Sequence, residues 1–159
     1  MIYEGNAIQV GDLSQGILEL VLNAKESPVN ILNQNAITEL RAAVDSIKAM
    51  QGIKGLVITS AKDAFVLGAD INEFSQLFAQ PADQLEQNLK LAHGIFNDIE
   101  DLPFPTVTAI NGDALGGGFA LALSTDFRVM SVNSKVGLPE INLGISPGFG
   151  GCIRLSGLI

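Results

Sequence analysis

Glycines followed by a single glutamate form the stretch of this sequence that favours catalysis. An apolar run over residues 106–110 leads into Gly112 and the glycines 116–118, which open a second apolar run, and Glu140 follows further along. A strand that feeds glycines and then a helix leaves N–H groups at the positive end of that helix, where an anion or a developing oxyanion can be held. A carboxylate beside such a site can transfer a proton. Glu140 is therefore the acid/base candidate.

The glycines alone leave two interpretations open. They do not form the phosphate loop GxxxxGK[ST], because Phe119-Ala120 stand in place of the lysine and the hydroxyl residue. Residues 148–151, Gly-Phe-Gly-Gly, do not complete GxGxxG either. Nucleotide binding of these two kinds is thus disfavoured. Close packing of a helix on a strand and an anion or oxyanion site remain equal alternatives at this point.

The composition describes one folded domain with an acidic balance. With 47% hydrophobic and 16% charged residues, the chain is too apolar to be disordered as a whole. Its 159 residues fit a single domain, because domain sizes cluster near about 100–150 residues. The net charge of −8 argues against nucleic acid or an anionic membrane surface as the main partner.

Cysteine usage and the apolar runs narrow the class further. The lone Cys152 excludes an internal disulfide framework and a cysteine-rich zinc site. Because His93 is the single histidine that could activate it, we expect Cys152 to be a small buried packing residue rather than a nucleophile. The first residues lack the pattern of a signal peptide, and no apolar run approaches the roughly 20 residues that span a bilayer. We expect a soluble, cytoplasmic protein without membrane insertion.

The elements that must position these residues alternate between strands and helices. Strands are predicted over residues 7–10, 17–23, 55–60, 106–110 and 126–130, and helices over 34–50, 83–101 and 117–125. The run over 55–60 is rich in β-branched residues, which predicts a strand buried on both faces. Pro103 and Pro105 end the second helix, because proline cannot continue one. This order predicts an α/β fold with βαβ crossovers and no internal domain boundary.

Several motifs in a fixed order resemble a known family. The blocks are Asn111-Gly112-x-Ala114-Leu115-Gly116-Gly117-Gly118, Asp126-Phe127-Arg128-Val129, Gly137-Leu138-Pro139-Glu140, Leu143-Gly144, Pro147-Gly148-x-Gly150-Gly151 and Phe65-x-x-Gly68-Ala69-Asp70-Ile71. Together they resemble the crotonase (enoyl-CoA hydratase/isomerase) superfamily over residues 2–159, and an ordered set of blocks is more specific than any single motif. The opening residues 1–5 and Val29-Asn30 are similar to the amino-terminal regions of alpha subunits of bacterial fatty acid oxidation complexes.

The resemblance implies a fold, a substrate and an assembly. We expect a crotonase (ClpP/crotonase-like) α/β fold built from ββα units and lacking its C-terminal helices, with residues 1–159 as an acyl-CoA-binding core that is a fragment of a longer chain. The substrate would be a fatty enoyl-CoA thioester of β-oxidation. CoA is part of that substrate, so no cofactor or metal is implied, and NAD would serve only a dehydrogenase part outside these residues. An oligomer, or a complex with a thiolase-type beta subunit, is also implied.

The resemblance assigns roles to individual positions. The N–H groups of Ala69 and Gly117 match the pair that holds the thioester carbonyl, and Glu140 matches the glutamate that moves a proton on the acyl chain. The loop 61–70 would lie along the CoA, with Lys62 as a phosphate contact. The remaining substrate-binding residues would be Gly68, Asp70, Gly116, Pro139 and Gly148. We also expect Asp70 to cap the helical turn that follows it, and Leu85, Leu89 and Phe96 to be core residues before they are acyl-chain lining.

One position departs from the family pattern. Hydratases of the superfamily carry a second glutamate three residues after the oxyanion glycine, and here that place is Ala120. Two carboxylates hold and split the added water, and a positioned acid/base group contributes about 10²–10⁴-fold. Moving a double bond from the 3 to the 2 position needs only one base, so we predict isomerisation in preference to hydration. The alternatives are a non-catalytic acyl-CoA-binding or assembly domain of the same fold, and another enolate chemistry of the superfamily.

Overall fold

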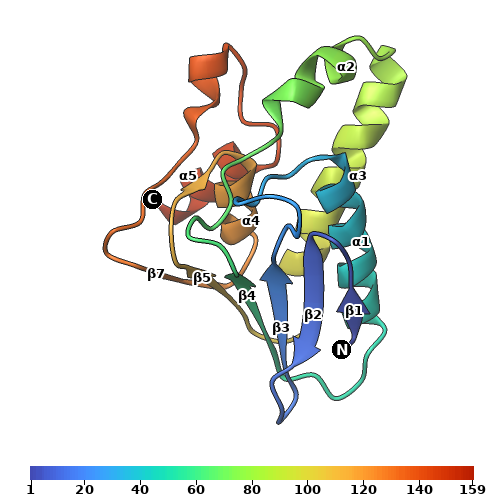
Figure 1. The fold of residues 1–159 in the computed structure, drawn as a ribbon, viewed down its shortest axis with the longest axis vertical. Coiled ribbons are helices and arrows are strands. Elements are labelled where there is room, and N and C mark those ends of the chain that lie inside the picture. The colour runs from blue at the N-terminus through green and yellow to red at the C-terminus, as the bar shows by residue number, and fades with distance from the viewer.

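Six strands form one mixed sheet in the computed structural model, which describes residues 1–159 (Figure 1). The sheet order is β1-β2-β3-β4-β5-β7. The antiparallel side contains β1 (Tyr3–Glu4), β2 (Ile8–Asp12) and β3 (Ile17–Leu22), and the parallel side continues from β3 through β4 (Gly55–Ser60), β5 (Thr106–Ile110) and β7 (Phe127–Met130). The predicted α/β order and all five predicted strands are confirmed.

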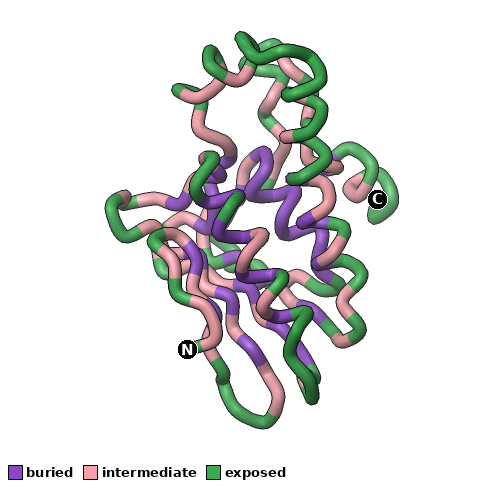
Figure 2. Tube along the Cα trace, turned by 90° about the vertical axis from the view of Figure 1, so that its right-hand side faces the viewer, coloured by how far each residue is buried: buried purple, intermediate pink, exposed green.

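Three helices cover one face of this sheet. They are α1 (Gln34–Lys48), α3 (Ala82–Glu100) and α4 (Gly117–Leu123). The buried side chains of α1 recur at helical spacing, for example Leu40, Val44 and Ile47, and pack into one apolar cluster with strand residues such as Leu20 and Ile58. Figure 2 shows the buried segments gathered in the middle of the molecule, whereas the end that carries α2 is exposed.

The other face of the sheet is less covered than the sequence predicts. Along β4, Leu56 and Ile58 are buried, whereas Val57 and Thr59 are only partly buried. The prediction that this strand is buried on both faces is therefore wrong. The reason is that α1, α3 and α4 lie on one face, so burial alternates with the period of two that is typical of a half-covered strand.

Short elements that lack a sequence period complete the fold. A second, two-stranded sheet pairs β6 (Ala114–Leu115) with β8 (Val136–Gly137) in parallel. The remaining elements are the 3-10 helices η1 (Ile71–Glu73) and η2 (Pro139–Leu143) and the α-helices α2 (Phe74–Phe78) and α5 (Gly151–Leu158). No helix of the structure is both long enough and apolar enough to cross a bilayer.

Cys152 does not occupy the position predicted for it. It is exposed on α5 rather than buried. The only buried residue of α5 is Gly151, so the rest of this helix, including Cys152, lies on the surface of the fold. The expectation of a buried cysteine is therefore wrong.

A buried carboxylate fastens the first strands to α1. Glu39 accepts hydrogen bonds from the N–H groups of Asn6, Ala7 and Ile8 at 2.8–3.0 Å and from the Asn35 side chain at 3.0 Å. Burial on its own would raise the pKa of Glu39, but these hydrogen bonds outweigh it and hold the pKa below its usual range. The ionised form therefore stabilises the fold.

Candidate active site

Three parallel segments bring the candidate residues to one edge. Val66 pairs with Ala114, and the Leu115 N–H donates to the Val66 carbonyl at 3.0 Å. On the other side β6 pairs with β8, and the Gly116 N–H donates to the Gly137 carbonyl at 2.9 Å. Parallel segments end at the same edge, which is where α/β proteins place their ligands. Ala69, Gly117 and Glu140 come from the chain just beyond these ends.

The two predicted oxyanion donors have N–H groups available for a ligand. The Leu32 N–H donates to the Gly68 carbonyl at 2.7 Å, which fixes the backbone at Ala69 while leaving the Ala69 N–H without an acceptor in the protein. Gly117 is the first residue of α4, so its N–H has no partner within the helix. Both groups line the same cavity. Two fixed donors directed at one space can stabilise a developing oxyanion.

Two of the glycines are required by space, and Gly116 is required by its backbone conformation as well. Gly116 has a φ of +54°, and a Cβ there would lie 2.8 Å from Oε1 of Glu140. A Cβ on Gly118 would lie 2.3 Å from the Val66 carbonyl oxygen. The absence of a Cβ at Gly116 leaves room for the Glu140 carboxylate beside the glycine loop. Its absence at Gly118 lets α4 pack directly on the backbone at Val66. The close-packing interpretation of the glycines therefore holds at Gly118, and the anion or oxyanion interpretation stays a prediction for the others.

Glu140 has a carboxylate that the protein leaves free. It lies on η2 and is half-buried, and no protein donor binds its side chain. Its Oε2 atom is buried without a hydrogen-bond partner. A buried carboxylate oxygen without a partner is costly unless a ligand uses it. The position of this oxygen in the cavity wall suits it to accept a proton.

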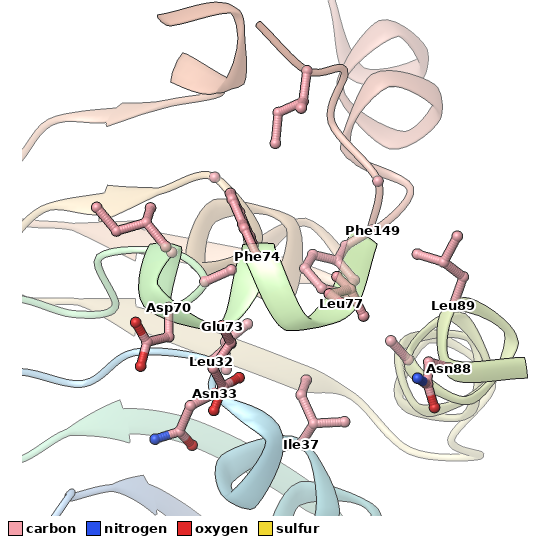
Figure 3. Close-up of a pocket in the computed structure, with 18 of the residues that line it drawn as sticks. Leu32, Asn33, Ile37, Asp70, Glu73, Phe74, Leu77, Asn88, Leu89 and Phe149 are labelled. Carbon is pink, nitrogen blue, oxygen red and sulfur yellow. The ribbon is translucent and has the colours of Figure 1, made fainter. Parts of the chain in front are cut away.

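The cavity has a volume of about 660 Å³ and lies between α1, α2, α3 and the glycine loop. Figure 3 shows Phe74, Leu77, Leu89 and Phe149 directed into this space, with Ile37 on the opposite side. Leu85 and Leu89 line the cavity and are partly exposed, so the expectation that they are core residues is wrong, whereas Phe96 is fully buried. The difference arises because α3 extends past the core towards α2. An apolar chain fits a cavity with these walls.

Polar residues at the rim hold short elements in place. The Asp70 carboxylate accepts from the Asn72 N–H at 2.9 Å and caps η1, as predicted. The Glu73 carboxylate accepts from the Gln34 N–H at 3.1 Å, at the start of α1. A negative charge at a helix N-terminus is favourable. These two acids therefore have structural partners, in contrast to Glu140.

Most of the predicted site residues meet in this cavity. Those that line it are Gly68, Ala69, Asp70, Gly116, Gly117, Pro139, Glu140 and Gly148. Lys62 does not line it, and its carbonyl accepts from the Asn111 side chain at 2.7 Å. Ala120 is 2% exposed, belongs to the apolar core and does not line the cavity either. No group of three or more histidine, cysteine or acidic side chains is arranged to hold a metal ion.

The sequence interpretation missed two residues of the cavity wall and its support. Leu32 and Phe149 line the cavity next to Gly117, where a Cβ would lie 3.1 Å from Leu32 and 2.9 Å from Phe149. Arg154 supports Phe149 by donating to its carbonyl at 3.4 Å. Phe149 lies within the block Pro147-Gly148-x-Gly150-Gly151, so its position between glycines was the available signal. No pattern in the sequence indicated the role of Arg154.

Sequence comparison finds relatives along the whole chain. A family model described as enoyl-CoA hydratase/isomerase matches residues 12–159. Proteins named fatty acid oxidation complex subunit alpha are 54% identical in Pseudomonas paraeruginosa and 51% identical in Pseudomonas putida, over 159 residues in each case. The match covers 100% of this chain and 22% of each relative. The chain thus spans about a fifth of the length of these relatives.

Comparison with solved structures finds the same fold. An enoyl-CoA hydratase from Bacillus anthracis superposes with a TM-score of 0.84 at 32% identity, covering 96% of this chain and 58% of the other. An enoyl-CoA hydratase structure from Geobacillus kaustophilus gives a TM-score of 0.87 at 30% identity, covering 99% of this chain and 58% of the other. The mixed sheet and its helices are therefore those of a crotonase-like fold.

Proposed function

The chain belongs to the enoyl-CoA hydratase/isomerase family, and from this premise we propose that it moves the double bond of fatty enoyl-CoA thioesters from the 3 to the 2 position in preference to hydrating it. The observation that carries the proposal is the presence of one free carboxylate in the cavity. Glu140 has a buried oxygen without a partner beside the donor loop, whereas the position of the second family glutamate is Ala120, buried in the apolar core.

The reaction needs one base and two donors. A thioester carbonyl that accepts from the N–H groups of Ala69 and Gly117 has its C2 carbon within reach of the Glu140 carboxylate. Glu140 removes a proton from C2, and the electron pair forms a dienolate whose oxygen the two N–H groups stabilise. The protonated Glu140 then returns the proton to C4, so that the double bond lies between C2 and C3. Each donor of this kind contributes on the order of 10²–10³ in rate.

Hydration needs two free acid/base groups, whereas the cavity wall has one. Water has to be oriented and split, with one group to take its proton and another to deliver a proton to the acyl chain. Of the acids in the wall, Asp70 caps η1 and Glu73 binds the start of α1, so both already have backbone partners. Glu140 alone is free, which suffices for transferring one proton between two carbons of the same molecule.

The cavity walls and the relatives support a fatty acyl substrate. Aliphatic and aromatic side chains from α1, α2 and α3 supply apolar walls, which suit a hydrocarbon chain. The alpha-subunit relatives bear a name that assigns them to a fatty acid oxidation complex. We extend the proposal to a cytoplasmic protein that works in such a complex with a thiolase-type subunit. A nicotinamide cofactor would belong to a further dehydrogenase part and not to this cavity.

A pair of substrates tests the proposal. The full encoded chain is supplied with 3-enoyl-CoA and 2-enoyl-CoA of the same chain length, and isomerisation and hydration are followed separately. We expect isomerisation to exceed hydration by about 10²-fold, since the second acid/base group is missing. Hydration as fast as isomerisation would overturn the preference. Binding of both thioesters without any turnover would instead support a non-catalytic acyl-CoA-binding domain.

A further inference from the structure

Residues 148–151 touch both parts of the candidate site. A Cβ on Gly117 would lie 2.9 Å from Cδ2 of Phe149, so the Phe149 ring lies directly against the donor glycine. A Cβ on Gly151 would lie 3.0 Å from Cδ2 of Leu138, the residue that precedes η2 and Glu140. A shift of this segment would therefore change the surroundings of both Gly117 and Glu140.

The Phe149 ring is held in a fixed orientation in the cavity wall. It pairs with Phe96 at a centroid distance of 5.7 Å and an interplanar angle of 57°. Phe96 is fully buried on α3, and tilted aromatic pairs of this kind are favourable. Figure 3 shows the Phe149 side chain entering the same space as Leu77 and Leu89. The ring therefore limits the cavity beside Gly117.

Arg154 fastens this segment to α3 through one guanidinium group. Its Nε and Nη2 atoms donate to Oε2 of Glu100 at 3.1 and 2.9 Å, and Nη2 donates to the Asn97 side chain at 2.8 Å. Its Nη1 atom donates to the Phe149 carbonyl at 3.4 Å. The side chain is only 11% exposed. The planar fork of an arginine can serve acceptors on two sides at once, which a lysine cannot.

We propose that Phe149 determines which acyl groups the cavity accepts by limiting its width beside Gly117, and that Arg154 is the positioning residue that holds Phe149 there. The ligands selected are acyl-CoA thioesters with straight chains, in preference to those that branch next to the thioester. The inference rests on the proposed function for the place of the thioester carbonyl at the Gly117 N–H.

The contacts of two consecutive glycines explain why branching is excluded. Oε1 of Glu140 lies against Gly116, and the Phe149 ring lies against Gly117. An acyl chain bound at the Gly117 N–H has its first carbons between that carboxylate and that ring. The carboxylate must stay within reach of C2, so the ring is the wall that meets a substituent on this carbon. In a close-packed site even one methyl group is discriminated.

Binding measurements with unreactive ligands test the inference apart from catalysis. Titration calorimetry on the full encoded chain compares octanoyl-CoA with 2-methyloctanoyl-CoA, which lack the double bond. We expect the unmodified chain to bind the straight ligand about tenfold more tightly, the size of discrimination typical of one methyl group in an apolar pocket. Phe149→Leu should bring the ratio of the two Kd values close to one. Arg154→Lys should lower it by about threefold, because the fork is lost.

A second arginine that binds an acid of α3 provides the matched control. Arg41 binds Asp98 of α3 at 2.8 Å and is 21% exposed, but it joins α1 to α3, and its ion pairs are with Asp45 and Asp98 rather than with residues 148–151. Arg41→Lys should lower the melting temperature as Arg154→Lys does while leaving the Kd ratio unchanged. An unchanged ratio in Phe149→Leu would overturn the role of Phe149, and an unchanged ratio in Arg154→Lys would overturn that of Arg154. Ligand selection as expected in a chain that turns over no 3-enoyl-CoA would support this inference and refute the proposed function.

Discussion

The two proposed oxyanion donors and the proposed acid/base residue are supported by different kinds of structure. Gly117 begins α4, in which all seven residues are buried, and Ala69 follows a segment that pairs with its neighbours through the backbone. Glu140 instead lies on η2, a five-residue 3-10 helix without a single buried residue. Gly117 and Ala69 are thus part of the framework, whereas Glu140 is attached to its edge.

Because of this difference, mutations near Gly117 and mutations at Glu140 should have different effects on stability and activity. The donor side depends on the absence of side chains, because a Cβ on Gly118 would meet the backbone of its neighbour. The Glu140 side depends on the chemistry of one carboxylate that no protein group binds. Changes on the donor side should therefore cost stability, and changes at Glu140 should cost activity without loss of stability.

Among the variants that test this difference, Glu140→Gln should have the largest effect, and the effect should be on activity. Removal of the base should lower the rate of 3-enoyl-CoA isomerisation by about 10²–10⁴-fold, because glutamine cannot exchange the proton. The melting temperature should stay the same, since no protein donor loses a partner. The control is Glu73→Gln, which changes another acid of the cavity wall. Isomerisation that survives in Glu140→Gln would show that another group is the base.

Ala120→Glu should add hydration activity by placing a second carboxylate near Gly117. Side chains of an α-helix lean towards its N-terminus, so a glutamate here reaches back towards Gly116 and Gly117. We expect hydration of 2-enoyl-CoA to rise by up to about 10²-fold, measured with isomerisation in the same preparation. Ala122→Glu, also at a buried position of α4, should give no gain. An equal lack of gain in both variants would contradict the placement of the missing carboxylate.

Gly118→Ala tests whether the donor side is a rigid framework. The added methyl group would lie 2.3 Å from the Val66 carbonyl oxygen, so the backbone has to move. Overpacking of this kind costs about 1–3 kcal/mol in the free energy of unfolding, which urea titration measures. Gly137→Ala is the control, because nothing lies within 4 Å of a Cβ there. Equal stability of the two variants would mean that the α4 packing is looser than the contact indicates.

Glu39→Gln should give the smallest effect and provides a baseline distant from the candidate site. The folded pKa of Glu39 lies below its unfolded value, so its stabilisation is present above about pH 4.3 and is lost as the pH falls through the folded pKa. The variant should be less stable by about 1 kcal/mol at neutral pH. Its stability should also depend less on acid, as urea titrations between neutral and acidic pH would show. A parallel acid dependence in both proteins would contradict this role.

The long elements of the fold could be predicted from the sequence because their apolar residues recur at a regular spacing over several turns or strand residues. The predicted helices over 34–50 and 83–101 correspond to α1 and α3, which end at Lys48 and Glu100. The strands β6 and β8 have two residues each and therefore carry no period. They are nevertheless the elements that bring Gly117 and Glu140 together. The fold was therefore easier to predict than the strand pairing that assembles the candidate site.

The candidate site could be predicted where it depends on glycines in order, and not where it depends on side-chain packing. The family resemblance of the ordered motifs grouped Ala69, Gly117 and Glu140, and all three line one cavity, while their roles stay a prediction. Leu89 was expected in the core because its spacing on the helix is apolar, and only the position of α2 shows that it lines a cavity. Arg154 likewise depends on acceptors on α3, more than fifty residues earlier in the chain. Contacts over that separation leave no local pattern.

The parallel pairing of β6 with β8 has a consequence for how the site can be observed. After β6 the chain passes through Gly117 and α4 to β7 and then returns to β8 beside β6, so this long connection has its two ends joined. The outermost part of that connection is the turn at Val132, which is 97% exposed. A spectroscopic reporter attached at Val132 would lie on the connection between β6 and β8, outside the residues that line the cavity. The protein thus provides an exposed attachment point for following the candidate site from outside.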